Sequence, residues 1–462
     1  MIRLFKHYVP YPVLLLGLLD FLLLILAAEI GWIVRASQIG MTPGGLWDRP
    51  LPILSFAFAL QLSLVAVGVY GTEALQSLRF AGARIVVAIS LGVIFLSLLA
   101  FALPGTTLWR SNSLYAMALA IALLMGLRIL LGTMLDSQIF KRRLLILGAG
   151  ARAQRIAELA ERQEAGFIIA AFINMSEGAV CVDGAFARGD IDNLSQFVID
   201  RKVSEVVLAL DERRNALPLS DLLRIKTTGV HVNEYSSFLE RETGRVDLES
   251  VNPSWFIFSD GFTAGQRVAK FVKRLFDIGA SIILLLLTGP IILFFALLVK
   301  METRGGAFFR QQRVGLYGVP FEILKLRSMR ADAEAGGKAI WASEDDPRIT
   351  RVGHFIRKVR IDELPQAWSV LKGEMSFVGP RPERPQFVNE LETEMPFYAE
   401  RHMVKPGITG WAQINYPYGA SVEDARHKLE YDLYYAKNYT PFLDLLILLQ
   451  TIRVILWPEG AR

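Results

Sequence analysis

Residues 361–366 read Ile-Asp-Glu-Leu-Pro-Gln, and residues 372–382 read Lys-Gly-Glu-Met-Ser-Phe-Val-Gly-Pro-Arg-Pro. Pro365 suits the first turn of a helix, where its missing N–H costs nothing, and apolar residues then recur at helical spacing. The pattern predicts a helix that begins at two adjacent carboxylates. Because anions and phosphates are favoured at a helix N-terminus, these acids can be a nucleophile and a metal ligand that face a phosphate. The ordinary alternative is that Asp362 only caps the helix.

Further motifs surround this stretch from Lys270 onward. They are Phe-Arg-Gln-Gln-Arg-Val-Gly at 309–315, Lys-Leu-Arg-Ser-Met at 325–329, Ile-Thr-Arg-Val-Gly at 349–353 and Lys-Pro-Gly-Ile-Thr-Gly-Trp-Ala-Gln at 405–413. In this order they make the chain resemble the bacterial sugar transferase family, the monotopic phosphoglycosyl transferases. The region 233–262 also resembles the exopolysaccharide transferases linked to the PEP-CTERM sorting system.

The resemblance implies an enzyme that transfers a sugar 1-phosphate from a UDP-sugar to a polyprenyl phosphate such as undecaprenyl phosphate. UMP is released, and the product starts an exopolysaccharide or a similar glycan. By resemblance, Asp362 is the nucleophile of a covalent aspartyl-phosphosugar intermediate, and Glu363 helps to hold Mg²⁺. This assignment agrees with general chemistry, because a carboxylate can form an acyl phosphate and Mg²⁺ needs few protein carboxylates beside a diphosphate.

Basic and amide side chains near these motifs are candidates for binding the donor, because arginine and lysine suit phosphate oxygens. The candidates are Lys325, Arg327, Arg351, Arg357, Arg381, Arg401 and Gln413. For any one of the basic residues, a solvated surface charge is the alternative. Trp411 can stack on a base or lie in the core, and we expect His354 and His402 to be structural.

Composition indicates a membrane protein, with 52 % hydrophobic residues among 462. Apolar stretches near 11–34, 51–70, 84–103 and 114–135 are each long enough to span a bilayer, which takes about 20 residues. The distribution of lysine and arginine places the N-terminus and everything after residue 140 in the cytoplasm. We therefore predict a multi-pass protein of the bacterial inner membrane, without a cleaved signal peptide. We expect Asp20 and Arg128 to face other helices.

A fifth apolar stretch, 277–300, has basic residues on both sides and Gly289–Pro290 at its middle. Both ends then prefer the cytoplasm, and the proline interrupts the helix. The pattern predicts a re-entrant helix–break–helix hairpin at about 274–300, in contact with membrane lipids. An ordinary kinked span is the alternative, but it would place Asp362 outside the cell, away from cytoplasmic nucleotide sugars.

The middle of the chain shows the strand–glycine turn–helix pattern of a dinucleotide-binding fold. A buried strand at 143–148 leads into Gly-Ala-Gly-Ala-Arg-Ala at 148–153 and a helix to about Gln163, with further strands at 167–173 and 205–210. The acid expected after the second strand is missing, since Asn174 ends that strand and Glu177 comes late. We expect a small Rossmann-like domain with a regulatory or subunit-contact role, and a bound dinucleotide is the alternative. We also expect the protein to be a homo-oligomer.

The expected architecture has three parts. A four-span helical membrane domain covers 1–140, the Rossmann-like α/β domain covers 141–262, and an α-rich α+β monotopic catalytic domain covers 263–462. The net charge of +5 suits membrane surfaces and phosphates and does not suggest a nucleic-acid partner, and the single Cys181 excludes an internal disulfide. Two rivals fit less well. A membrane-bound nucleotide-sugar dehydratase or epimerase needs a Tyr-x-x-x-Lys pair, which the sequence lacks, and a polysaccharide chain-length scaffold leaves the acid pair unexplained.

Overall fold

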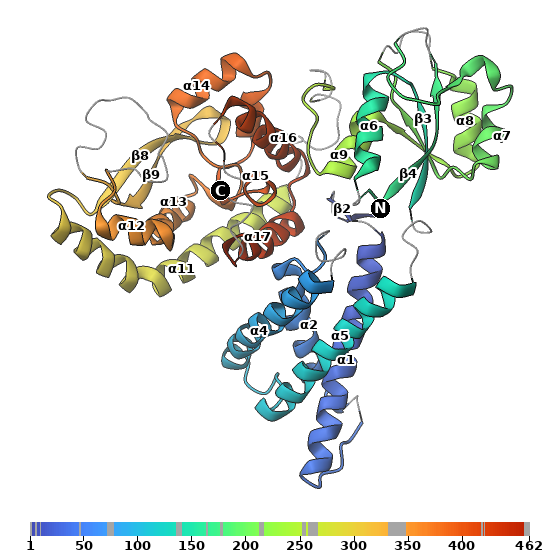
Figure 1. The fold of residues 1–462 in the computed structure, drawn as a ribbon. Coiled ribbons are helices and arrows are strands. Elements are labelled where there is room, and N and C mark those ends of the chain that lie inside the picture. Colours follow the sequence, from blue (N-terminus) through green and yellow to red (C-terminus); the bar gives the residue numbers. More distant parts are fainter. Residues whose placement is uncertain are drawn as a thin grey trace. The chain divides into compact units, whose positions relative to one another are not determined.

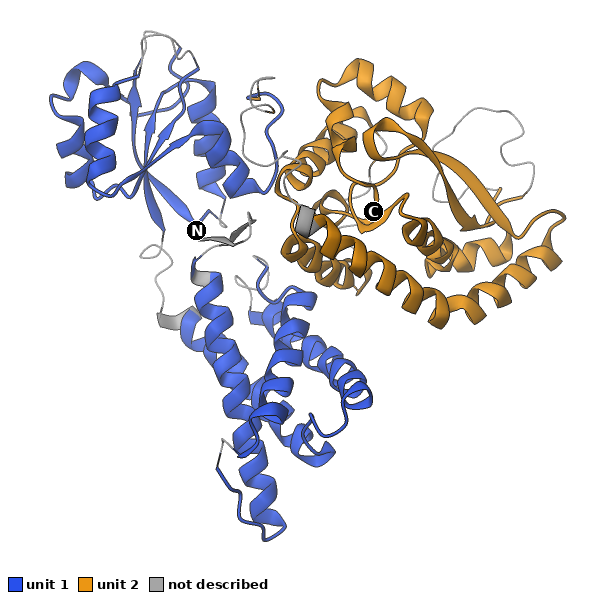
Figure 2. Ribbon diagram, turned by 180° about the vertical axis from the view of Figure 1, so that it is seen from behind, with its two compact units in different colours: residues 1–4, 8–250 blue, residues 5–7, 251–462 orange. Residues whose placement is uncertain are grey.

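The computed structural model divides the chain into two compact units, residues 1–4 with 8–250 and residues 5–7 with 251–462 (Figure 2). The structure describes the chain except for residues 1, 5–6, 10, 46–47, 72–77, 135–140, 163–164, 176–178, 212–216, 252–255, 257–266, 331–347, 417–418, 420 and 457–462. The sequence interpretations that involve Leu135, Gln163, Glu177 and Phe262 therefore lie outside the described residues. Two three-residue strands, β1 (Ile2–Leu4) and β2 (His7–Val9), precede the first helix.

The first unit begins with apolar helices that match the predicted stretches. They are α1 (Tyr11–Gln38), α2 (Pro50–Val67), α4 (Leu78–Ala102) and α5 (Arg110–Met134). All four are long and apolar enough to cross a membrane. Asp20 of α1 and Arg128 of α5 form a buried ion pair with an N–O distance of 2.7 Å, and the Tyr70 hydroxyl donates to the same carboxylate. Both charges thus face neighbouring helices, as predicted.

The same unit contains a parallel sheet with the strand order β5-β4-β3-β6-β7. The strands are β3 (Arg142–Leu147), β4 (Phe167–Asn174), β5 (Phe186–Ala187), β6 (Glu205–Leu208) and β7 (His231–Glu234). The helices are α6 (Ala151–Glu161), α7 (Leu194–Asp200), α8 (Leu219–Thr227) and α9 (Tyr235–Thr243). Helices α6 and α9 cover one face and α7 and α8 the other, each pair over its own apolar core (Figure 1). The α/β prediction is confirmed.

The second unit is mainly helical, with short sheets that position loops. A long helix, α11 (Arg267–Glu302), leads into an antiparallel pair, β8 (Phe308–Val314) and β9 (Pro320–Leu326). Next come α12 (Arg351–Lys358), the 3₁₀ helix η4 (Ile361–Gln366), α13 (Ala367–Lys372) and β10 (Ser376–Val378), which pairs in parallel with β11 (Gly407–Thr409). The remaining helices are η3 (Leu316–Gly318), α14 (Pro385–Glu394), η5 (Tyr398–Met403), α15 (Trp411–Asn415), α16 (Val422–Asn438) and α17 (Pro441–Leu456).

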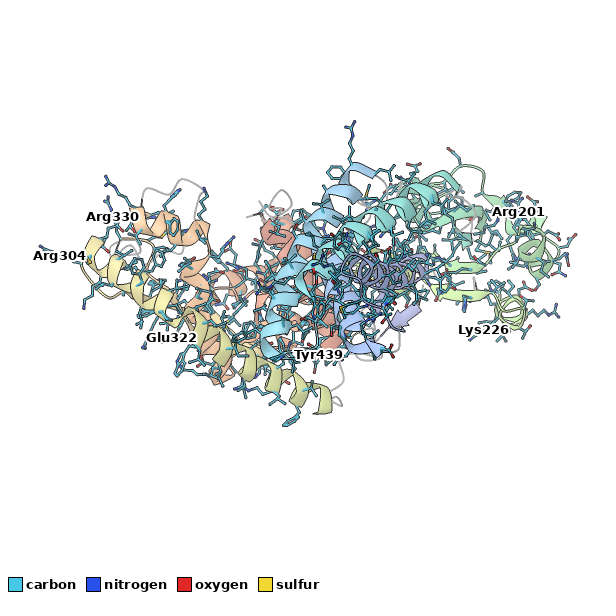
Figure 3. The ribbon with its side chains drawn as sticks, turned by 90° about the horizontal axis from the view of Figure 1, so that it is seen from below. Arg201, Lys226, Arg304, Glu322, Arg330 and Tyr439 are labelled. Carbon is cyan, nitrogen blue, oxygen red and sulfur yellow. The ribbon has the colours of Figure 1, made fainter. Side chains whose placement is uncertain are left out.

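The helix α11 differs from the predicted hairpin in one respect. It runs without interruption through Pro290, so the expected break is absent, and Figure 1 shows a bent helix instead. Proline removes one helical hydrogen bond and bends a helix without necessarily ending it. On its inner side Ile292, Ala296 and Val299 pack against β9 and α12. In Figure 3 the helix lies in front of the rest of its unit and leads toward Arg304.

The outer side of α11 is strongly apolar. Its large apolar side chains that are more than half exposed are Phe271, Leu275, Ile283, Leu286, Leu287, Leu293, Phe294, Leu297 and Met301. A continuous exposed apolar surface of this kind marks contact with another apolar phase, and the helix is itself long and apolar enough to cross a membrane.

Candidate active site

The acid pair lies at the start of a helical segment, as predicted, although the first turns are 3₁₀. Arg360 precedes η4 in the left-handed region (φ 61°), which is an uncommon conformation for a non-glycine residue. This conformation turns the chain sharply between α12 and η4, and strained backbone of this kind gathers at functional sites. Asp362 is 8 % exposed, and its buried Oδ1 has no hydrogen-bond partner among the described residues. An unpartnered carboxylate oxygen is available to a reacting group.

Glu363 has two cationic neighbours from distant parts of the chain. Its Oε1 lies 2.8 Å from Lys325 Nζ, supplied by the end of β9, and 3.5 Å from an Arg381 guanidinium nitrogen. Burial by itself would raise the pKa of Glu363, but the charges of Lys325 and Arg381 outweigh it and hold the pKa well below its usual range. Glu363 is therefore charged at every physiological pH.

The pKa of the adjacent Asp362 is shifted in the opposite direction. Burial, and then the neighbouring Glu363 charge, raise the pKa of Asp362 to about 6, against the opposing charges of Lys325, Arg357 and Arg360. Near pH 7 most molecules carry the carboxylate. A desolvated carboxylate that is only just ionised is a stronger nucleophile than an ordinary exposed one.

The loop that carries Arg381 is fixed through its backbone carbonyls. Arg401 donates to the Arg381 carbonyl and Arg313 to the Pro382 carbonyl, both at 3.0 Å, while the Gly407 amide donates to the Pro380 carbonyl. Gly379 permits this packing, because a Cβ at that position would lie 2.1 Å from the Lys405 carbonyl oxygen. With the carbonyls bound to the protein, the Arg381 side chain extends toward Glu363.

Arg401 and Arg327 lie in structural positions. The buried Arg401 guanidinium pairs with Asp432 at 2.7 Å and donates to the Tyr398 hydroxyl. Arg327 donates to the carbonyls of Thr303 and Arg304, and so caps the C-terminal end of α11. The terminal nitrogens of both guanidinium groups are thus bound to protein oxygens.

The remaining candidates divide between the site and the surrounding structure. Arg357, half-buried near the end of α12, lies close enough to lower the pKa of Asp362. Arg351 is exposed at the start of α12, and Gln413 donates to the Ile408 carbonyl at 3.2 Å. The structure thus brings together the acids with Lys325, Arg357 and Arg381, but records no contact of Arg351 or Gln413 with the acids among the described residues.

Trp411 and His402 both lie in buried positions. Trp411 is buried and stacks on Tyr434 with ring centroids 5.8 Å apart, which supports the core interpretation. Burial and the Arg401 charge lower the pKa of His402 to about 3, so this histidine stays neutral, in line with a structural role.

The acid pair is compatible with a Mg²⁺ ion, although the described residues contain no group of three or more metal-ligating side chains. Mg²⁺ commonly uses one or two carboxylates, with waters and substrate phosphates completing its octahedron. Glu363 would supply such a carboxylate, with its Oε1 atom already facing Lys325 and Arg381.

Sequence reasoning missed the residues that support the site. Arg313 belongs to the motif at 309–315, and Asp432 to the segment Lys428–Asp432, which also resembles a family pattern, but neither suggested a role, and Tyr398 gave no sequence signal. The partner of Asp432 is Arg401, 31 residues away, and that of Arg313 is the Pro382 carbonyl, 69 residues away, so the sequence alone does not show these pairings.

Comparison with known proteins identifies two regions. Residues 268–458 match the model of the bacterial sugar transferase family, and residues 65–227 match the model of a CoA-binding domain. The chain is 45 % identical to the UDP-N-acetylgalactosamine-undecaprenyl-phosphate N-acetylgalactosaminephosphotransferase of Aeromonas hydrophila, over 50 % of this chain and 53 % of that protein. It is 46 % identical to the uncharacterized sugar transferase EpsL of Bacillus subtilis, over 41 % of this chain and 90 % of EpsL.

A third relative is the UDP-glucose:undecaprenyl-phosphate glucose-1-phosphate transferase of Xanthomonas campestris pv. campestris. It is 34 % identical over 58 % of this chain and 56 % of its own length. The chain thus spans about half the length of the Aeromonas and Xanthomonas relatives.

Proposed function

Because this chain belongs to the bacterial sugar transferase family, we propose that it transfers a sugar 1-phosphate from a UDP-sugar to a polyprenyl phosphate. The product would begin an exopolysaccharide or a related glycan at the inner membrane. The single observation that carries the proposal is the pair of adjacent acids with opposite pKa shifts, placed beside Lys325 and Arg381.

The reaction proceeds in two displacements at one phosphorus atom. A carboxylate oxygen of Asp362 attacks the phosphorus that bears the sugar, and the bond from that phosphorus to the bridging oxygen breaks. UMP leaves with the bridging oxygen and its electron pair, and an aspartyl phosphosugar remains. An oxygen of the polyprenyl phosphate then attacks the same phosphorus, which breaks the bond to Asp362 and restores the carboxylate.

The other residues of the site bind and orient the donor. Arg381 and Arg357 supply positive charge for the diphosphate oxygens, and Lys325 keeps Glu363 ionised and in place. When bound beside Glu363, Mg²⁺ would neutralise charge on the departing UMP phosphate.

We also propose that α11 enters and leaves one leaflet, so that the site faces the cytoplasm. Arg274 near its start donates to the Val370 and Leu371 carbonyls, and Val299 near its end packs in the same compact unit. A helix that crossed the bilayer would separate these two contacts. The 36 residues of α11 correspond to about 54 Å of helix. This length exceeds a ~30 Å hydrocarbon core and suits a bent helix inserted from one side.

The topology is tested with single cysteines at positions 270 and 304 in a Cys181→Ser background. An impermeant thiol reagent applied to intact cells should label neither site, and both should react after the cells are opened. Labelling of position 304 alone in intact cells would show that α11 crosses the membrane.

The chemistry is tested by incubating the membrane-embedded protein with UDP-sugars carrying a labelled sugar. UMP release and protein-bound label are measured without lipid acceptor, and kinetics are measured with it. We expect label on wild-type protein, none on the Asp362→Asn variant, and ping-pong kinetics. Label that persists on Asp362→Asn protein would remove Asp362 as nucleophile, and absence of UMP release from every donor would contradict the proposed function.

A further inference from the structure

A buried polar network joins the membrane helix to the loop that carries Arg381. Lys273 of α11 lies with its Nζ 2.5 Å from Asp444 Oδ2 and 3.0 Å from the Val378 carbonyl oxygen. The Tyr435 hydroxyl lies 2.7 Å from Asp444 Oδ1 and 3.1 Å from the same carbonyl. Val378 ends β10 and directly precedes Gly379, where the loop begins. Side chains of α11 and α16 thus bind one backbone oxygen, and Asp444 of α17 binds both of these side chains.

This network contains charged side chains in a buried position, where an unpaired charge would destabilise the fold. Tyr435 is 1 % exposed and Asp444 is 7 % exposed, and a buried carboxylate is costly unless it is paired. Lys273 supplies the pairing charge and donates to the Val378 carbonyl. The single hydroxyl proton of Tyr435 is shared between Asp444 Oδ1, at 2.7 Å, and the Val378 carbonyl, at 3.1 Å. The carbonyls of Pro380, Arg381 and Pro382 are bound by Gly407, Arg401 and Arg313. At the start of the loop, Lys273 and Tyr435 act beside two backbone contacts, from the Gly379 amide to the Thr409 carbonyl and from the Phe377 amide to Asp277 of α11.

We infer that Lys273 is a positioning residue for Arg381, acting through the Val378 carbonyl together with Tyr435 and Asp444. The inference rests on the proposed function, in which the Arg381 side chain binds a donor phosphate. It assigns the positioning of that side chain to Lys273, a residue of α11. The neighbouring Arg274 binds the end of α13, which follows the acids. Consecutive residues of α11 therefore hold both halves of the site, so the seating of the membrane helix sets the distance between Arg381 and Glu363.

The test compares Lys273→Met and Tyr435→Phe with Lys270→Met. Lys270 is exposed one turn earlier on the same helix, so its replacement removes the same membrane-proximal charge. Lys273→Met keeps the length of the side chain, and Tyr435→Phe removes one hydroxyl while leaving the Lys273–Asp444 pair in place. If Lys273→Met does not fold, Tyr435→Phe still tests the inference.

Two measurements are made on the full chain in lipid nanodiscs. Hydrogen exchange of the peptide covering 376–384 reports the loop without any need for activity, and UMP release reports kcat and KM. We expect faster exchange and a kcat lowered about tenfold, or ~1.4 kcal/mol, for Lys273→Met and Tyr435→Phe, and neither effect for Lys270→Met. Arg381→Lys should then cost much less activity in the Lys273→Met background than in the wild type, because the two changes act on one interaction.

The outcomes separate this inference from the proposed function. Unchanged exchange at 376–384, or faster exchange with an undiminished kcat, would overturn the positioning role of Lys273. Independent, additive effects of Lys273→Met and Arg381→Lys would also overturn it. Absence of UMP release from the wild type would overturn the proposed function instead, and exchange would still decide whether Lys273 fixes the loop.

Discussion

Replacement of Asp362 by asparagine should stabilise the folded protein while abolishing transfer. Burial and the Glu363 charge raise the pKa of Asp362 from its ordinary 3.8 to about 6. The difference corresponds to ~3 kcal/mol of unfavourable interaction in the ionised state, at ~1.4 kcal/mol per pH unit. Asparagine keeps the shape and removes the charge, so ~3 kcal/mol is the upper limit of the gain. A site that is arranged for chemistry therefore lowers the stability of its own fold.

The sign of the pH dependence follows from proton binding. Between about pH 4 and pH 6 the folded protein holds a proton at Asp362 that the unfolded chain has lost. This site therefore makes wild-type stability fall as pH rises through that window, after which its contribution is constant. The advantage of Asp362→Asn should be small near pH 4 and complete by pH 7.

The assay is thermal unfolding in nanodiscs, with EDTA present so that no divalent cation neutralises the acids. For a domain of 150–250 residues, each ~1 kcal/mol added to the free energy of unfolding raises Tm by roughly 2–4 °C. The Tm of Asp362→Asn should therefore exceed that of the wild type by up to ~6–12 °C at pH 7.5. Glu363→Gln is the matched control. Lys325 and Arg381 stabilise the Glu363 charge, so this variant should lower Tm. An unchanged or lower Tm for Asp362→Asn at pH 7.5, or an advantage that grows toward pH 4.5, would refute the reasoning.

Three further predictions concern activity and packing. The kcat/KM should fall with slope one below about pH 6 and be about tenfold lower at pH 5 than on the plateau, measured as UMP release; a flat profile would show that Asp362 ionisation does not limit the rate. Arg401→Met should cost about 3–5 kcal/mol in unfolding measurements because it leaves Asp432 buried and unpaired, whereas a further Asp432→Leu change should recover stability but not activity; equal stability of the two variants would contradict this. Gly379→Ala should lower kcat strongly by displacing the loop from the Lys405 carbonyl, with Gly289→Ala as the control because a Cβ there meets nothing within 4 Å, and normal activity of Gly379→Ala would refute the close packing.

Much of the secondary structure could be read from the sequence because its signals are local. The buried strand before Gly148, the glycine turn and the following helix are defined by neighbouring residues, and the parallel sheet confirms them. The short strand β7 was not predicted. Its residues, His-Val-Asn-Glu, alternate neither in hydrophobicity nor in burial, so the sequence showed no strand pattern there.

The roles of the arginines could not be read in this way. Lys325 and Arg327 are two residues apart in one motif, yet Lys325 binds Glu363 and Arg327 caps α11. The difference arises because β9 ends at Leu326, so the chain no longer alternates when it reaches Arg327. Similarly, the partner of Arg401 is Asp432, in a different helix, and only the fold reveals that this arginine supports Arg381. Side-chain roles depend on such long-range partners.

The two acids are equivalent in sequence, and their environments make them different. The Glu363 Oε1 atom faces both Lys325 and Arg381, so its charge is stabilised and its nucleophilicity is reduced. Asp362 Oδ1 is buried with no partner among the described residues, and burial keeps the charge of Asp362 poorly stabilised. Groups whose pKa values are driven apart by their surroundings usually perform different tasks. In the proposed mechanism, these opposite environments favour Asp362 for attack on phosphorus and the permanently charged Glu363 for binding cations.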